Sequence, residues 1–169
     1  MELGQEFQLE IEQFVQEINS PDLLNVILRG HLYIEAKIIE LLENRFTHPE
    51  EFRMSDINYP NKINLCVALG IIDRSETKAY LKLNKLRNTM AHQLQPSQIE
   101  KEIGDIISSL SNEQRKLYKT NKKEDGLLYN LRKALAVLFV DLNVILESIK
   151  HEDQLFQEII PLFKDYKKE

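Results

Sequence analysis

The feature of this 169-residue sequence that most constrains its fold is the spacing of its apolar residues. They recur three or four positions apart almost throughout, which places them on one face of an α-helix. No segment alternates polar and apolar residues as a half-buried strand does. Only five glycines and five prolines interrupt the pattern. We therefore expect an all-α fold, with residues 1–169 forming one helical bundle of about five main helices and some short helices.

The ends of the expected helices follow from residues that cap or break helices. Ser20 is expected to cap the second helix, with Pro21 at its first position. Gly70 is a candidate left-handed residue at a helix end, and Pro161 is a candidate kink. The expected helices cover residues 2–18, 21–46, 61–69, 74–92, 98–109, a short charged stretch from 111, 127–150, and a final stretch to about 166, with a loop at 47–60.

Composition and residue spacing exclude several classes of protein. The net charge of −5 argues against a general DNA-coating protein. The glycines are isolated and the histidines lack metal-ligand spacing, so we expect no nucleotide loop, metal or cofactor. No run of about 18 apolar residues is present, so no membrane span is expected. Cys66 is the single cysteine and cannot form an internal disulfide, which favours a cytoplasmic protein.

Two polar residues interrupt the apolar stripe of the second expected helix. His31 and Glu35 lie in the middle of this line, where an unpaired carboxylate is costly. One interpretation is a structural His–Glu or Glu–Arg bond in the core. The other is that these residues orient a catalytic group. The complete stripe is Leu24, Leu28, His31, Glu35, Ile38 and Leu42.

A second candidate site lies near the end of the expected helix over 74–92. Arg87 is at the edge of the apolar stripe, where a guanidinium requires a carboxylate or a phosphate. His92 follows five positions later, shortly before Pro96. Positions five apart point about 140° apart on a helix, so the two side chains converge only through a distorted last turn or a second subunit. A core-edge arginine and a histidine that favours the helix dipole are the structural alternative.

A basic cluster begins within the expected short helix that starts at 111. Five basic residues lie between positions 115 and 123, with Tyr118 among them. Such a cluster can contact an RNA backbone or form a solvated, charged hairpin. Lys85 is a further candidate RNA contact beside Arg87. The cluster consists of Arg115, Lys116, Lys119, Lys122 and Lys123.

The sequence over residues 86–92, Leu-Arg-Asn-Thr-Met-Ala-His, resembles a known signature. Arginine, a polar residue often asparagine, and a histidine after a short spacer are typical of the HEPN superfamily (higher eukaryotes and prokaryotes nucleotide-binding domains). Arg87, Asn88 and His92 occupy these three positions. A wider pattern, covering roughly residues 23–94, also resembles the mannitol operon repressor group of small helical proteins.

The HEPN resemblance implies a dimerising helical bundle in which two motifs face one cleft. Many members are metal-independent ribonucleases of toxin–antitoxin, CRISPR or phage-defence systems. By this resemblance His92 handles a proton of the attacking 2′-hydroxyl or of the leaving group. Arg87 neutralises charge on the scissile phosphate, and Asn88 orients the phosphate or His92. The implied partners are RNA, a second copy of the chain, and an antitoxin or regulatory protein.

Two further expectations follow from the resemblance. Some toxin members carry a tyrosine two residues after the histidine, as the target of nucleotide transfer. This position is Leu94 here, so that mode of control is not expected. The alternative function is a non-catalytic helical regulator like the mannitol operon repressor group, in which Arg87 pairs with a core carboxylate such as Glu35.

Overall fold

The computed structural model describes residues 5–92, 96–118 and 126–164, and all of their side chains except those of His92 and residues 155–164. These residues form seven α-helices, two short 3-10 helices and no strand, which confirms the all-α prediction. The helices are α1 (Gln5–Glu17), α2 (Leu23–Arg45), η1 (Pro49–Glu51), η2 (Met54–Asp56), α3 (Tyr59–Ala68), α4 (Thr77–His92), α5 (Pro96–Ser108), α6 (Asn112–Tyr118) and α7 (Leu127–Lys164).

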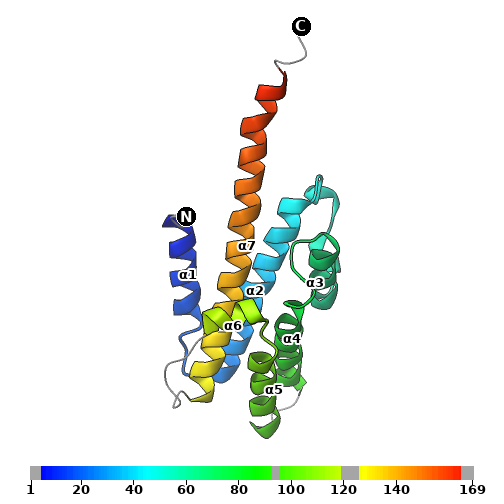
Figure 1. The fold of residues 1–169 in the computed structure, drawn as a ribbon. Coiled ribbons are helices and arrows are strands. Elements are labelled where there is room, and N and C mark those ends of the chain that lie inside the picture. The colour runs from blue at the N-terminus through cyan, green and yellow to red at the C-terminus, as the bar shows by residue number, and fades with distance from the viewer. Residues whose placement is uncertain (1–4, 93–95, 119–125, 165–169) are drawn as a thin grey trace.

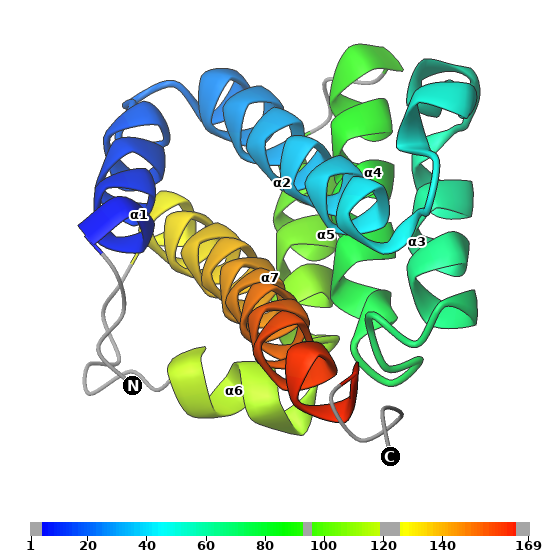
Figure 2. The ribbon, with the colours of Figure 1, turned by 90° about the horizontal axis from the view of Figure 1, so that it is seen from above.

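Helices α2 and α7 form the centre of the bundle. α7 packs against α1, α2, α5 and α6, and α2 also packs against α1, α3 and α4. Helices α4 and α5 lie side by side on the opposite side of α2 and α7 from α1 (Figures 1 and 2). The C-terminal part of α7 extends beyond the other helices (Figure 1). One continuous hydrophobic cluster fills the space between these helices.

The start of α2 differs from the predicted cap. Asp22, not Ser20, is the N-cap, and its side chain accepts a hydrogen bond from the backbone N–H of Leu24. Ser20 Oγ instead accepts from the backbone N–H of Asp22, so Pro21 lies before the helix. Gly70 adopts the predicted left-handed conformation after α3, with φ of 69°.

The end of the chain also differs from the prediction. α7 is one helix of 38 residues, where the sequence predicted a break after residue 150 and a separate final helix. The stretch at 150–154 is polar, but it contains no glycine or proline that would interrupt the backbone. The described side chains of residues 150–154 are all exposed, as expected where α7 leaves the bundle.

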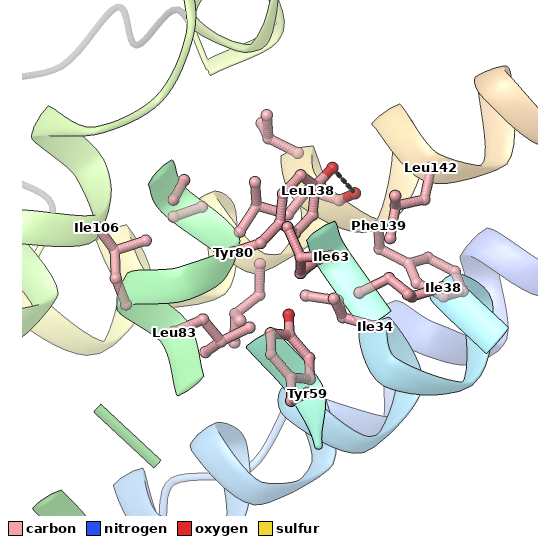
Figure 3. Packing of buried hydrophobic residues seen from close by; sticks show 14 of the residues in the cluster. Ile34, Ile38, Tyr59, Ile63, Tyr80, Leu83, Ile106, Leu138, Phe139 and Leu142 are labelled. Atoms are coloured by element: carbon pink, nitrogen blue, oxygen red, sulfur yellow. Dashed lines mark hydrogen bonds between the residues drawn. The ribbon is translucent and has the colours of Figure 1, made fainter. Parts of the chain in front are cut away.

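A buried hydrogen-bond network connects α4, α6 and α7. The hydroxyl of Tyr80 donates to Asp141 Oδ2 at 2.8 Å and approaches the carbonyl oxygen of Leu138 at 3.2 Å (Figure 3). Gln114 Nε2 donates to the same Asp141 oxygen at 2.8 Å. Burial raises the pKa of Asp141, and the two donated hydrogen bonds oppose that rise. The network therefore fixes α6 by satisfying a carboxylate that is largely removed from water.

Removal of the Tyr80 hydroxyl is expected to destabilise the fold. In Tyr80→Phe, Asp141 loses one of its donors in a buried position, and the free energy of unfolding should fall by about 1–3 kcal/mol. Tyr129→Phe is the matched control, because Tyr129 is half exposed and should change stability by less than about 0.5 kcal/mol. Urea denaturation measures both. Equal stability of the two variants would show that the network contributes nothing.

Candidate functional site between helices α2, α3 and α4

An open pocket of about 320 Å³ lies between three helices. It brings His31 and Glu35 of α2 together with Arg87, the first residue of the motif at the end of α4. The pocket is lined by Leu28, His31, Leu32 and Glu35 of α2, by Tyr59 of α3, and by Asn84 and Arg87 of α4.

The floor of the pocket is organised by a buried ion pair. Lys62 Nζ donates to Glu35 Oε1 at 2.7 Å, and the lysine side chain is 5% exposed. The other oxygen of this carboxylate lies 3.7 Å from His31 Nδ1. The predicted proximity of His31 and Glu35 is therefore present, and the Glu–Arg alternative is replaced by a lysine from α3. Asn58 places that lysine, because its side chain caps the first turn of α3.

His31 is held from both sides within this group. Its Nε2 lies 3.2 Å from Asn84 Oδ1, and its ring packs against that of Tyr59 in a tilted arrangement with 4.6 Å between centroids. Burial lowers the pKa of His31, and the positive charges of Arg87 and Lys62 lower it further. The negative charge of Glu35 and the hydrogen bond with Asn84 act in the opposite direction. The pKa of His31 is therefore set by opposing effects, of which burial is the largest.

The hydroxyl of Tyr59 belongs to the core. It is directed into the hydrophobic cluster (Figure 3), is fully buried, and has no hydrogen-bond partner among the described residues. Burial raises the pKa of this hydroxyl well above its usual value, so the group stays neutral. The tyrosine thus presents its ring to His31.

Arg87 is exposed and borders the pocket. Its Nη1 donates to Asn88 Oδ1 at 3.2 Å, so the asparagine of the motif orients the arginine. α4 remains helical through His92, whose side chain lies outside the described residues. Positions 87 and 92 therefore stay about 140° apart on a regular helix. Of the two routes to convergence that the sequence left open, the distorted last turn is absent from α4.

Lys85 lies on another face of α4 and is already paired. Its Nζ is 3.2 Å from Glu102 Oε1 on α5. The same oxygen accepts a hydrogen bond from Thr89 Oγ1 at 3.0 Å, and the glutamate is 3% exposed. Lys85 thus neutralises a buried carboxylate, and this pairing competes with its predicted contact to RNA.

The predicted basic cluster does not line the pocket. Arg115 donates to the carbonyl oxygens of Leu110 at 2.9 Å and Ser108 at 2.5 Å, and so completes the end of α5. Lys116 pairs with Glu113 at 2.6 Å. Helix α6 packs against α7, away from α2 and α3 (Figure 2). Lys119, Lys122 and Lys123 lie outside the described residues.

Sequence reasoning did not assign a role to three residues of this site. Asn84 lies three positions before Arg87, and this spacing places both on one face of α4. Tyr59 and Lys62 are likewise three positions apart on α3. The sequence predicted this short helix but assigned no functional residue to it. Their position on one face of α3 is a signal from which the sequence could have predicted that they belong to one site. Their contact with α2 depends on the packing of the bundle.

Comparison with models of protein families, with curated proteins and with solved structures finds no match to this chain. The chemistry of the pocket therefore rests on its own geometry. None of the described helices combines the length and apolar character needed to cross a lipid bilayer. Nor do the described residues contain three or more His, Cys, Asp or Glu side chains grouped so that they could hold a metal ion.

The lowered pKa of His31 predicts how stability depends on pH. The unfolded chain binds a proton near pH 6.5, whereas the folded chain resists it, so the free energy of unfolding should fall as the pH drops below about 6.5. His31→Gln should lose less stability than the wild type between about pH 7.5 and pH 5. His48→Gln is the control, since His48 is exposed. Identical pH dependence in all three proteins would contradict the assignment.

The exposure of Arg87 predicts that it contributes little to folding. Arg87→Ala should change the free energy of unfolding by no more than about 0.5 kcal/mol, as is usual for an exposed position. An arginine paired with a core carboxylate would instead cost about 3–5 kcal/mol when removed. Chemical denaturation separates these values, and a loss in the larger range would favour the structural interpretation of the motif.

Proposed function

We propose that this chain is a metal-independent endoribonuclease of the HEPN type, which cleaves RNA by attack of the 2′-hydroxyl in a cleft between two copies. One observation carries the proposal. Arg87, the first residue of the Arg-Asn-x-x-x-His motif, borders the same pocket as the buried His31 group. A guanidinium at the edge of a polar pocket is suited to a phosphate.

In this proposal Arg87 binds the scissile phosphate. Among the described residues it donates one hydrogen bond, to Asn88, and a guanidinium carries five N–H donors. The remaining donors allow a bidentate contact to two phosphate oxygens. As charge accumulates on those oxygens in the transition state, the interaction strengthens and lowers the barrier. Asn88 keeps the guanidinium in place during this change.

His92 acts as the proton-transfer group for the 2′-hydroxyl. The ordinary pKa of a histidine near 6.5 suits it to accept this proton at neutral pH. Attack of the 2′-oxygen on phosphorus gives a 2′,3′-cyclic phosphate and a 5′-hydroxyl. DNA lacks the 2′-hydroxyl, so the reaction is restricted to RNA.

The proposal requires a second copy because of the helix geometry. A row of exposed leucines, two of which line the pocket, supports it. Leu24, Leu28 and Leu32 of α2 are 38%, 36% and 58% exposed. They follow one another at four-residue intervals, so they form an apolar strip along α2. Burial of this strip against the same strip of a second copy removes apolar area from water. It would also bring the second motif toward the pocket.

The proposal includes a biological setting of the toxin or phage-defence type, with an antitoxin or regulatory protein as a partner. Such an enzyme must be restrained, and the open pocket is a surface that an inhibitory partner can cover. Lys85 is the predicted RNA contact nearest to Arg87. The basic residues of α6 lie farther away and would contact RNA beyond the scissile phosphate.

The second candidate function is a non-catalytic regulator like the mannitol operon repressor group. The Lys62–Glu35 pair favours it, because this group is satisfied within the fold and requires no substrate to explain it. In that case the pocket would bind an anionic ligand without cleaving it. The two candidates differ in whether His92 is needed for a chemical step.

Replacement of His92 is expected to abolish RNA cleavage. Purified wild-type protein in excess EDTA should cleave total cellular RNA to products with 2′,3′-cyclic phosphate ends. His92→Ala should lose this activity while its helicity, measured by circular dichroism, is unchanged. His48→Ala, which removes an exposed histidine distant from the motif in sequence, should retain it. Undiminished cleavage by His92→Ala would refute the proposed mechanism.

The apolar strip of α2 is expected to be a dimer interface. Leu32→Glu should convert the dimer to a monomer in light-scattering measurements, because it buries a charge within the interface. Leu117→Glu is the control, since Leu117 on α6 is 53% exposed and lies away from this strip. A Leu32→Glu protein that remains dimeric would place the interface elsewhere.

A further inference from the structure

We infer that His31 is a second proton-transfer group of the pocket, which becomes protonated when a phosphate binds beside Arg87 and donates its proton to the leaving 5′-oxygen. The inference about the chemical step rests on the proposed ribonuclease function. The sequence suggested only that His31 is structural or orients another group. The arrangement of charges around the ring supports a more direct role.

Both ring nitrogens of His31 face oxygen atoms. Nε2 lies 3.2 Å from Asn84 Oδ1, and Nδ1 lies 3.7 Å from Glu35 Oε2. A neutral imidazole has one N–H, whereas an imidazolium has two. The oxygen atoms therefore provide a place for the second proton, and the fold is prepared for the charged form of His31.

Other groups hold the ring neutral while the pocket is empty. His31 is only 5% exposed, and burial disfavours its charge. Lys62 of α3 and Arg87 of α4 add positive charge nearby, and the Tyr59 ring contributes no compensating charge. Glu35 is the negative group among these neighbours, and Lys62 already neutralises much of it. Within the described part of the chain, these and Asn84 are the titratable and polar groups that face the ring.

A bound phosphate changes this balance. It places negative charge beside Arg87 and within the pocket that His31 lines. One positive charge that opposed protonation is thereby neutralised, and a new negative charge favours it. Protonation of His31 and binding of phosphate should therefore be linked, each strengthening the other.

The proton then has a defined use in the reaction. The 2′-oxygen forms a bond to phosphorus, the bond between phosphorus and the 5′-oxygen breaks, and His92 accepts the 2′-hydroxyl proton. The proton on His31 Nε2 moves to the departing 5′-oxygen, which takes the place of Asn84 Oδ1 as its acceptor and leaves as a hydroxyl. Because the base and the acid are separate groups, both proton transfers can take place in a single transition state.

The leaving group tests this role. Once the cleavage site of the wild type is mapped, two RNA oligonucleotides are compared, one natural and one with sulfur in place of the scissile 5′-oxygen. A thiolate leaves without a proton. His31→Gln should slow cleavage of the natural RNA by about 10²–10⁴-fold and of the sulfur-containing RNA by less than about tenfold. His92→Ala, which removes the base, should slow both. Equal losses for His31→Gln on the two substrates would overturn the inference.

Binding tests the inference without catalysis. Sulfate is the probe, because its charge is constant across the titration range of histidine. The pH midpoint of the His31 imidazole, followed by NMR and assigned from the signal missing in His31→Gln, should rise with sulfate by about one unit. Arg87→Ala should abolish this shift. His31→Asn replaces the glutamine variant in the cleavage test if that variant unfolds.

The two tests separate the proposals. If wild-type protein fails to cleave RNA but sulfate still shifts the midpoint, the ribonuclease function is wrong and the linkage of phosphate to His31 stands. If wild-type protein cleaves RNA but His31→Gln loses both substrates equally, the function stands and the role of His31 is wrong. A His31 midpoint that does not respond to sulfate overturns the linkage.

Discussion

The ion pair between Lys62 and Glu35 determines the geometry on which the pocket depends. Burial of a lysine side chain that is 5% exposed is costly without a partner, and the 2.7 Å contact supplies one. The pair joins α3 to α2 and fixes the carboxylate beside His31. His31 in turn approaches Asn84 on α4. Three helices are therefore joined through a chain of polar contacts. Apolar contacts alone would not fix the relative positions of these helices so closely.

The sequence predicts the helical framework well, and the reason is physical. Apolar periodicity reports which face of each helix is buried, and local end signals such as Gly70 report where a helix stops. The predicted cap at Ser20 was wrong because both Ser20 and Asp22 are residue types that can cap a helix. The backbone geometry makes Asp22 the N-cap. The predicted break after residue 150 was wrong because polar residues alone do not end a helix.

The candidate site was predictable only in part. His31, Glu35 and Arg87 stand out because each is polar within or beside an apolar stripe. Lys62 and Asn84 do not, because each becomes notable only through a partner on another helix. Contacts between distant segments depend on packing, which one sequence does not display. Leu24 and Leu28 belong to the predicted apolar stripe of α2 and yet are exposed, since periodicity does not show which part of a stripe the other helices cover.

The proposed active site differs from a simple surface motif in that one chain does not complete it. A regular α4 holds positions 87 and 92 about 140° apart, so the phosphate-binding arginine and the proton-accepting histidine that act together should come from different copies. The pocket, the apolar strip beside it and the motif are consistent parts of such an arrangement. An interface that creates the site would also allow a regulatory partner to control activity by controlling assembly.

Mixing two inactive variants tests this shared site most directly. Arg87→Ala and His92→Ala, each inactive alone, would be combined under conditions in which subunit exchange is followed by fluorescence energy transfer. The account predicts that the mixed dimer regains a substantial part of the RNA cleavage, because Arg87 of one copy meets His92 of the other. Complete exchange of subunits without any recovery of cleavage would contradict it.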